Sequence, residues 1–221
     1  MNDFEYEIDD SEVTITGYTG AGGDVVVPST LGGFSVTTIG DRAFEGCHGL
    51  TSITLPDGLT TIGYQAFERC TGLTSITLPN SITAIGAYAF LHCRSLTSIT
   101  LGNNIIIIGT RAFNGCAGLT SITLPNSLTT IGFGHSVFAH CTGLTSITLP
   151  SSITTIGGYA FQGCTGLTSI YALGNAPTLG GAVFDRVTAT VYYYRSATGF
   201  TNPWGGLTTE ARNDPTEGGD L

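Results

Sequence analysis

The chain contains no lysine: its seven basic residues are all arginine, against sixteen acidic ones, and its formal net charge is −9. Nucleic acids and anionic membranes bind cationic patches, so this composition argues against both as partners. No apolar run approaches the ~18 residues of a membrane-spanning helix, so we expect no direct membrane insertion. The acidic start MNDFEYEIDD lacks the apolar core of a signal peptide. It predicts an intracellular protein, or a secreted one whose leader is absent from this sequence.

Carboxylates are missing from the whole middle of the chain, because none occurs between Arg69 and Phe184. Six acids fall within the first twelve residues and four within the last twelve. Charged ends around a neutral middle are typical of a rod whose caps supply the solubility. At 221 residues, the chain is long enough for one or two domains.

Arrangements that carry chemistry are also lacking. There is no G-x-S-x-G motif, no phosphate-binding glycine loop and no C-x-x-C pair. No acid of the central segment is available to orient His92, His135 or His140, and we expect these and His48 to be surface side chains. The sequence therefore predicts a non-enzymatic protein with no metal and no cofactor.

What the chain does contain is an internal sequence repeat, represented by LTSITLPNSITAIGAYAFLHC from Leu73. Units start at residues 50, 73, 96, 119, 144 and 167, so the period is 23 residues with one step of 25. A fixed period in the twenties is typical of a leucine-rich-repeat solenoid. In the unit from Leu73, alternation points Ile76 and Leu78 inward and their neighbours outward. We expect Phe90 and Cys93 to fill the interior from a short helical or 3₁₀ segment.

Both ends depart from the repeat. Residues 1–21 predict an N-terminal β-hairpin cap, and residues 22–189 predict a solenoid of about seven coils. A closing β-strand cap is expected at 190–209, followed by a disordered acidic tail at 210–221. The predicted fold is one elongated domain, either α/β or mostly β, with a parallel sheet on one face.

The pattern LTSITLPxSITxIGxxAFxxCxG resembles the BspA-like, or Treponema pallidum-type, leucine-rich repeats, over about residues 4–206. The resemblance implies a right-handed solenoid with no shared catalytic residues. It also implies a secreted or cell-surface location, with extracellular matrix, host or other surface proteins as partners.

The six cysteines occur once per coil, at one equivalent position. Equivalent residues of adjacent coils lie about 4.8 Å apart with parallel side chains, too far for the ~3.5–4.5 Å between the Cβ atoms of a disulfide. We therefore expect a stacked column of buried free thiols, comprising Cys47, Cys70, Cys93, Cys116, Cys141 and Cys164.

Two surfaces are candidate ligand faces. The first is a ladder of outward hydroxyls, made of Ser52, Thr54, Ser75, Thr77, Ser98, Thr100, Ser121, Thr123, Ser146 and Thr148. The second is a contact side with Ile106 and Ile107, which stand where other coils carry Thr or Ala, and with Phe133 and His135 in the two-residue insertion. The residue immediately before the Ala/Val-Phe pair is equivalent in every coil, and we expect these residues to line a further edge. They are Arg42, Gln65, Tyr88, Arg111, Ser136 and Tyr159.

Three functions remain open. The first is adhesion or protein–protein interaction, which rests on the family resemblance. The second is a structural spacer within a larger surface protein. The third is ice or surface binding through the hydroxyl ladder, which we regard as the least favoured because leucine-rich-repeat sheets usually curve.

Overall fold

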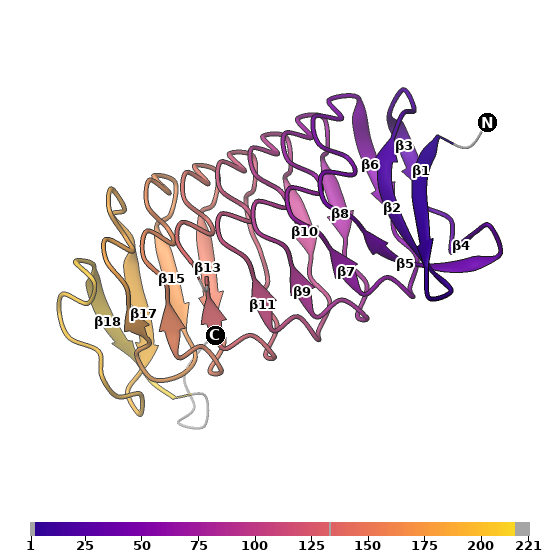
Figure 1. Cartoon of the computed structure of the whole chain (residues 1–221). Coiled ribbons are helices and arrows are strands. Elements are labelled where there is room, and N and C mark those ends of the chain that lie inside the picture. Colours follow the sequence, from indigo (N-terminus) through magenta and orange to yellow (C-terminus); the bar gives the residue numbers. More distant parts are fainter. Residues whose placement is uncertain (1–2, 133, 215–221) are drawn as a thin grey trace.

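A computed structural model describes residues 3–132 and 134–214 and shows a β-solenoid with the N- and C-terminal strands at opposite ends (Figure 1). Each coil is named here by its phenylalanine, so that coils 1–7 carry Phe44, Phe67, Phe90, Phe113, Phe138, Phe161 and Phe184. All regular elements of the described residues are strands. No helix in that part of the chain is long and apolar enough to cross a membrane.

One long face is a stack of parallel strands in two groups, and Thr123, between the groups, forms a parallel bridge to Thr148 of the second one. Equivalent residues pair in register, as Ser75 does with Ser98 and Thr77 with Thr100. The strands are β3 (Gly23–Val26), β6 (Leu50–Thr54), β8 (Ser75–Thr77), β10 (Ser98–Thr100), β13 (Ser146–Leu149), β15 (Ser169–Ala172), β17 (Thr190–Tyr194) and β18 (Thr208–Arg212).

A second parallel stack faces the other way, which adds to the single sheet face that the sequence predicted. Its strands are β2 (Glu12–Tyr18), β5 (Phe34–Ile39), β7 (Thr61–Ile62), β9 (Ala84–Ile85), β11 (Ile107–Ile108), β12 (Thr130–Ile131), β14 (Thr155–Ile156) and β16 (Thr178–Leu179). Two antiparallel strands complete the N-terminal end: β1 (Phe4–Asp9) pairs with β2, and β4 (Thr30–Leu31) with β5.

The segment around each phenylalanine is not helical, so the expected helical or 3₁₀ segment is wrong. Every second backbone N–H group of the segment donates to the next coil, and the N–H groups between them close tight turns within their own coil. Arg42, Phe44 and Gly46 donate to the carbonyls of coil 2 at 2.9, 2.8 and 2.7 Å, and later coils repeat the pattern. Residues two before and two after each phenylalanine have positive φ, which no right-handed helix allows. We call this hydrogen-bonded segment the turn edge.

The core is a set of columns that run along the solenoid axis. Consecutive phenylalanine rings of coils 1–7 stack with centroids 5.1–5.8 Å apart. Tyr18 closes this ring stack at the N-terminal end and Trp204 at the C-terminal end. Each coil alone has one apolar side that it cannot bury, so stacking supplies the core.

The predicted cysteine column lies beside the ring stack, with all six thiols free and all but Cys47 buried. The thiols of Cys70 and Cys93 donate to the carbonyls of Phe44 and Phe67, both at 3.0 Å. Burial raises the pKa of Cys93 and Cys164 to about 12, so these thiols stay protonated near neutral pH. They act as small core side chains and not as nucleophiles.

The C-terminal cap differs from the expected boundary at residue 210. Strand β18 extends from Thr208 to Arg212 and pairs in parallel with β17, so the first residues of the expected disordered tail belong to the sheet. The charged residues Glu210 and Arg212 favour a disordered tail in the sequence, but in the structure they belong to a strand whose side chains alternate between exposed and half-buried. Residues 215–221 of the predicted tail lie outside the described residues.

Candidate interaction surfaces

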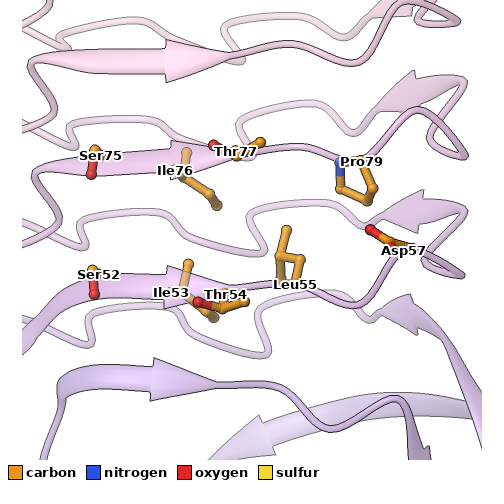
Figure 2. Close-up of a pocket in the computed structure, with 9 residues that line it drawn as sticks. All are labelled: Ser52, Ile53, Thr54, Leu55, Asp57, Ser75, Ile76, Thr77 and Pro79. Carbon is orange, nitrogen blue, oxygen red and sulfur yellow. The ribbon is translucent and has the colours of Figure 1, made fainter.

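The predicted hydroxyl ladder lies on the first sheet, and we call it the hydroxyl face. Figure 2 shows Ser52 below Ser75 and Thr54 below Thr77, in two columns. These four residues are among those that line a shallow depression of about 380 Å³. Their neighbours Ile53 and Ile76 are buried beneath. The exposed or half-buried hydroxyls of these columns are Ser52, Thr54, Ser75, Thr77, Ser98, Thr100, Ser121, Thr123, Ser146 and Thr148.

Threonine hydroxyls next to the start of the strands form hydrogen bonds between adjacent coils. The Thr74 and Thr97 hydroxyls each donate to the carbonyl of the equivalent threonine one coil earlier, at 3.1 Å. At the N-terminal end, Asp24 accepts from Thr51 at 3.0 Å and Ser52 at 2.7 Å, and these bonds lower the pKa of its carboxyl. Part of the polarity of this sheet therefore holds adjacent coils together.

The predicted contact side is divided by the structure. Ile106 and Ile107, with 49% and 39% of their surface exposed, lie at β11 on the second sheet. Phe133 lies outside the described residues. His135 lies on the turn edge, where its carbonyl accepts from the Arg111 N–H at 3.1 Å.

A row of large side chains follows the turn edge over coils 1–6. Arg42 lies over the Tyr64 ring at 5.7 Å, and Tyr64 meets Tyr88 edge-on at 5.5 Å. Arg111 lies 5.8 Å from the centroid of the Tyr88 ring on its other side, and the His135 and Tyr159 rings are 6.0 Å apart. We call these residues the turn-edge row: Arg42, Tyr64, Tyr88, Arg111, His135 and Tyr159. The sequence placed Arg42, Tyr88, Arg111 and Tyr159 at one position, but gave no sign of their mutual contacts.

Four residues of the row stand at a left-handed backbone position, where glycine would be least strained: Arg42, Tyr88, Arg111 and Tyr159. Two residues before the phenylalanine, φ lies between +51° and +66° in all seven coils, and none of the seven residues is glycine: Arg42, Gln65, Tyr88, Arg111, Ser136, Tyr159 and Ala182. Two residues after it, φ is also positive, but three of the seven residues are glycine: Gly46, Gly115 and Gly163. A left-handed non-glycine residue costs about 1–2 kcal/mol, so side chains are kept at the first position at an energetic cost.

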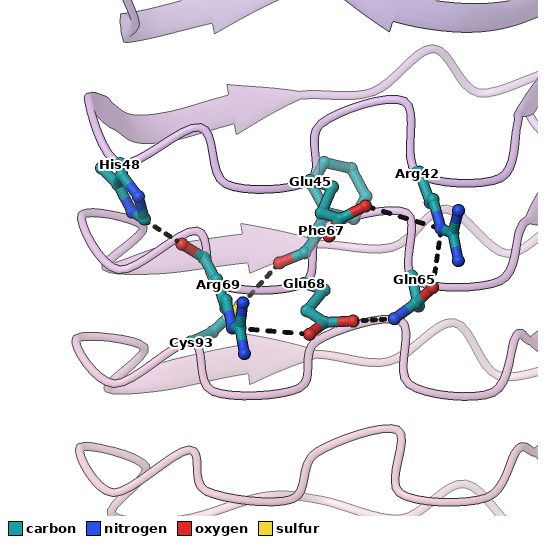
Figure 3. Close-up of polar contacts among 8 residues, drawn as sticks. All are labelled: Arg42, Glu45, His48, Gln65, Phe67, Glu68, Arg69 and Cys93. Atoms are coloured by element: carbon teal, nitrogen blue, oxygen red, sulfur yellow. Dashed lines mark hydrogen bonds and ion pairs between the residues drawn. The ribbon is translucent and has the colours of Figure 1, made fainter.

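Charge varies along the turn edge. In coils 1 and 2, Arg42 donates to Gln65 at 2.8 Å and lies 3.5 Å from Glu45, while Arg69 lies 3.6 Å from the buried carboxylate of Glu68 (Figure 3). The next carboxylate is Asp185 in coil 7. Among the described residues, Arg94 and Arg111 form no ion pair, so the cations of the middle coils are uncompensated.

The described residues hold no group of three or more His, Cys, Asp or Glu side chains that could bind a metal ion. The histidines follow the turn edge and do not converge. The His48 ring contacts the Arg69 carbonyl at 3.1 Å, and burial, with help from Arg94 and Arg69, lowers the pKa of His92.

Comparisons with known proteins agree with this architecture. A family model described as the BspA type leucine-rich repeat region matches in six copies over residues 33–135 and 133–196. A leucine-rich repeat protein of T. pallidum is 35% identical, with a TM-score of 0.76 over 82% of this chain and 85% of that one. A leucine-rich cell surface protein of Faecalibacterium prausnitzii is 32% identical, with a TM-score of 0.73 over 86% of this chain.

The chain spans about half, 53%, of that F. prausnitzii protein. No curated protein matches the chain. The repeat that the sequence carries, its solenoid structure and its similarity to both proteins lead to one conclusion: the chain belongs to the BspA-type family of leucine-rich repeat proteins.

Proposed function

We propose that the chain is a non-enzymatic adhesion or protein-interaction module of a bacterial surface, and that it binds its partner through the turn-edge row. The observation that carries the proposal is that four of the six residues of the row, Arg42, Tyr88, Arg111 and Tyr159, hold left-handed positions without being glycine. Backbone strain held in register over successive coils is a reason to look for function at those positions. The description of the F. prausnitzii protein as a cell surface protein supports the location.

The composition of the row suits a protein partner. Arginine and tyrosine are enriched among the residues that dominate binding energy, whereas serine and threonine are under-represented. Tyr64 and Tyr159 are 39% and 42% exposed, so their rings remain available for contact. The hydroxyl face instead presents small, hydrated groups, whose desolvation offsets much of what a contact would gain.

Rigidity also favours the turn edge. In each of coils 1–6, three backbone hydrogen bonds to the next coil hold the segment, as in coil 3, where Tyr88, Phe90 and His92 each donate to coil 4 at 2.8 Å. A side chain on a fixed backbone loses less entropy on binding than one on a flexible loop. The row therefore presents preorganised anchors.

The experiment is solid-phase binding of the purified chain to immobilised matrix and plasma proteins, including fibronectin and fibrinogen. Replacing both Tyr88 and Tyr159 by Ala should weaken saturable binding by about tenfold or more. Ser75→Lys with Ser98→Lys on the hydroxyl face is the matched control and should leave it unchanged. Binding that is lost only in the lysine variant would move the site to the hydroxyl face. Saturable binding unchanged in both variants would reject the turn-edge row as the contact surface.

A further inference from the structure

We infer that the middle of the turn-edge row, from Tyr88 to Tyr159, accepts an acidic segment of a polypeptide, with Arg111 as its ion-pairing centre. The inference rests on the proposed function and adds the chemistry of the partner. Its basis is a local charge opposite in sign to that of the whole molecule. Arg94 and Arg111 are the only charged residues in 70–183, so this segment carries a formal charge of +2. The remaining residues carry −11, which gives the net charge of −9.

Distance keeps this positive region separate from the acidic ends. Glu68 lies in coil 2 and Arg111 in coil 4, so two coil spacings of about 4.8 Å, roughly 10 Å, lie between them along the axis. Asp185 in coil 7 is three spacings away, about 14 Å. The screening length at physiological salt is about 8 Å, so neither carboxylate cancels the charge of Arg111 for a ligand in contact with it.

The surroundings of Arg111 favour a peptide. Its guanidinium lies 5.8 Å from the Tyr88 ring centroid and forms no ion pair with any described carboxylate, so it can still pair with a carboxylate of the ligand. Tyr88 and Tyr159 flank it one coil before and two coils after. Side chains on one face of an extended peptide repeat about every 6.8 Å, which allows an acidic residue at Arg111 and apolar or aromatic neighbours on the tyrosines.

The test uses fluorescence anisotropy with three labelled peptides of equal length, built on the repeats Glu-Ser-Tyr-Ser, Gln-Ser-Tyr-Ser and Lys-Ser-Tyr-Ser. In each peptide the variable residue and Tyr share one face of the extended chain. We call them the Glu-Tyr, Gln-Tyr and Lys-Tyr peptides. We expect the Glu-Tyr peptide to bind at least tenfold more tightly than the Gln-Tyr peptide. Its affinity should fall as salt is raised, and the Lys-Tyr peptide should not bind. Arg111→Glu should abolish Glu-Tyr binding, and Arg111→Lys should retain most of it. Arg186→Glu is the matched control, because it makes the same change of charge at an exposed arginine that lies outside the row, beside Asp185.

Equal affinity for the Glu-Tyr and Gln-Tyr peptides would overturn the inference, as would equal loss in the Arg111→Glu and Arg186→Glu variants. Tighter, Arg111-dependent binding of heparin would overturn it in favour of a polyanionic glycan. Circular dichroism of each variant separates lost binding from lost folding. If matrix-protein binding needs Tyr88 and Tyr159 but ignores salt and Arg111→Glu, the proposed function survives and the acidic partner fails. If the acidic peptide binds through Arg111 but no matrix or plasma protein binds, the acidic ligand survives and the proposed function fails.

Discussion

The hydroxyl face and the turn edge come from the same repeat, yet one is uniform and the other varied. On the hydroxyl face, successive coils place Ser over Ser and Thr over Thr, and the pairing is in register. On the turn edge, the residue two before each phenylalanine changes from Arg to Gln to Tyr along the solenoid, although the backbone there repeats closely. The uniform columns repeat one small side chain in every coil, whereas the turn edge sets different side chains on a constant backbone, which is the arrangement that our proposal assigns to recognition.

The largest expected effect comes from removing what both surfaces share. Phe113→Ala should lower the free energy of unfolding by about 3–5 kcal/mol, because the ring is fully buried and stacks on Phe90 and Phe138. Urea denaturation followed by circular dichroism measures the loss. Leu173→Ala, at a side chain 45% exposed, is the control and should change stability little. A similar small loss at Phe113 would mean that the ring stack does not support the coils.

The second prediction separates the two surfaces by binding. Arg111→Ala should weaken partner binding by about five- to thirtyfold, while Thr100→Ala on the hydroxyl face should leave it within twofold. Both residues are exposed and both lie in the middle of the solenoid. Surface plasmon resonance against the partner found in the solid-phase screen measures both. The reverse ranking would show that the uniform face is the one used for recognition.

The sequence predicts the hydroxyl face and the buried columns, but not the backbone conformation of the turn edge. Period and alternation determined the repeat, the inward phenylalanines and cysteines and the outward hydroxyls, because stacked coils must share one register. For the turn edge the sequence predicts a helical or 3₁₀ segment, because glycine is the ordinary signal of a left-handed conformation and is absent there from the position two before each phenylalanine. Arg, Gln and Tyr stand there instead, since hydrogen bonds to the next coil hold the backbone in place. The contacts of His135 depend on the two-residue insertion and have no sequence signal.

The third prediction tests the energetic cost of the left-handed positions directly. Gly46→Ala should lower stability by about 1–2 kcal/mol, because φ is +69° there and nothing lies within 4 Å of an added Cβ, so backbone strain is the only cost. Ala182→Gly should raise stability by about 0.5–1 kcal/mol, because φ is +51° at an exposed alanine. Thermal unfolding of both variants measures the pair. If neither changes stability, the side chains of the turn-edge row are kept without strain and the main support for the proposed function is lost.

The smallest expected effect concerns charge on the turn edge. Burial, then Arg94 and Arg69, lower the pKa of His92 below the ordinary 6.5. The folded chain therefore favours the neutral ring, and the unfolded chain takes up a proton first as the pH falls. The stability that His92 contributes is present above pH 6.5 and declines on acidification through the folded pKa.

NMR titration of the imidazole should show that Arg94→Gln moves the His92 pKa upward, while Arg111→Gln leaves it in place, because Arg111 is not among the groups that perturb it. Equal upward shifts in both variants would mean that the cations of the middle coils act as one diffuse field. In that case an acidic ligand would not be centred on Arg111. The turn edge would then differ from the hydroxyl face in its side chains and backbone, but not in a local charge that selects an acidic ligand.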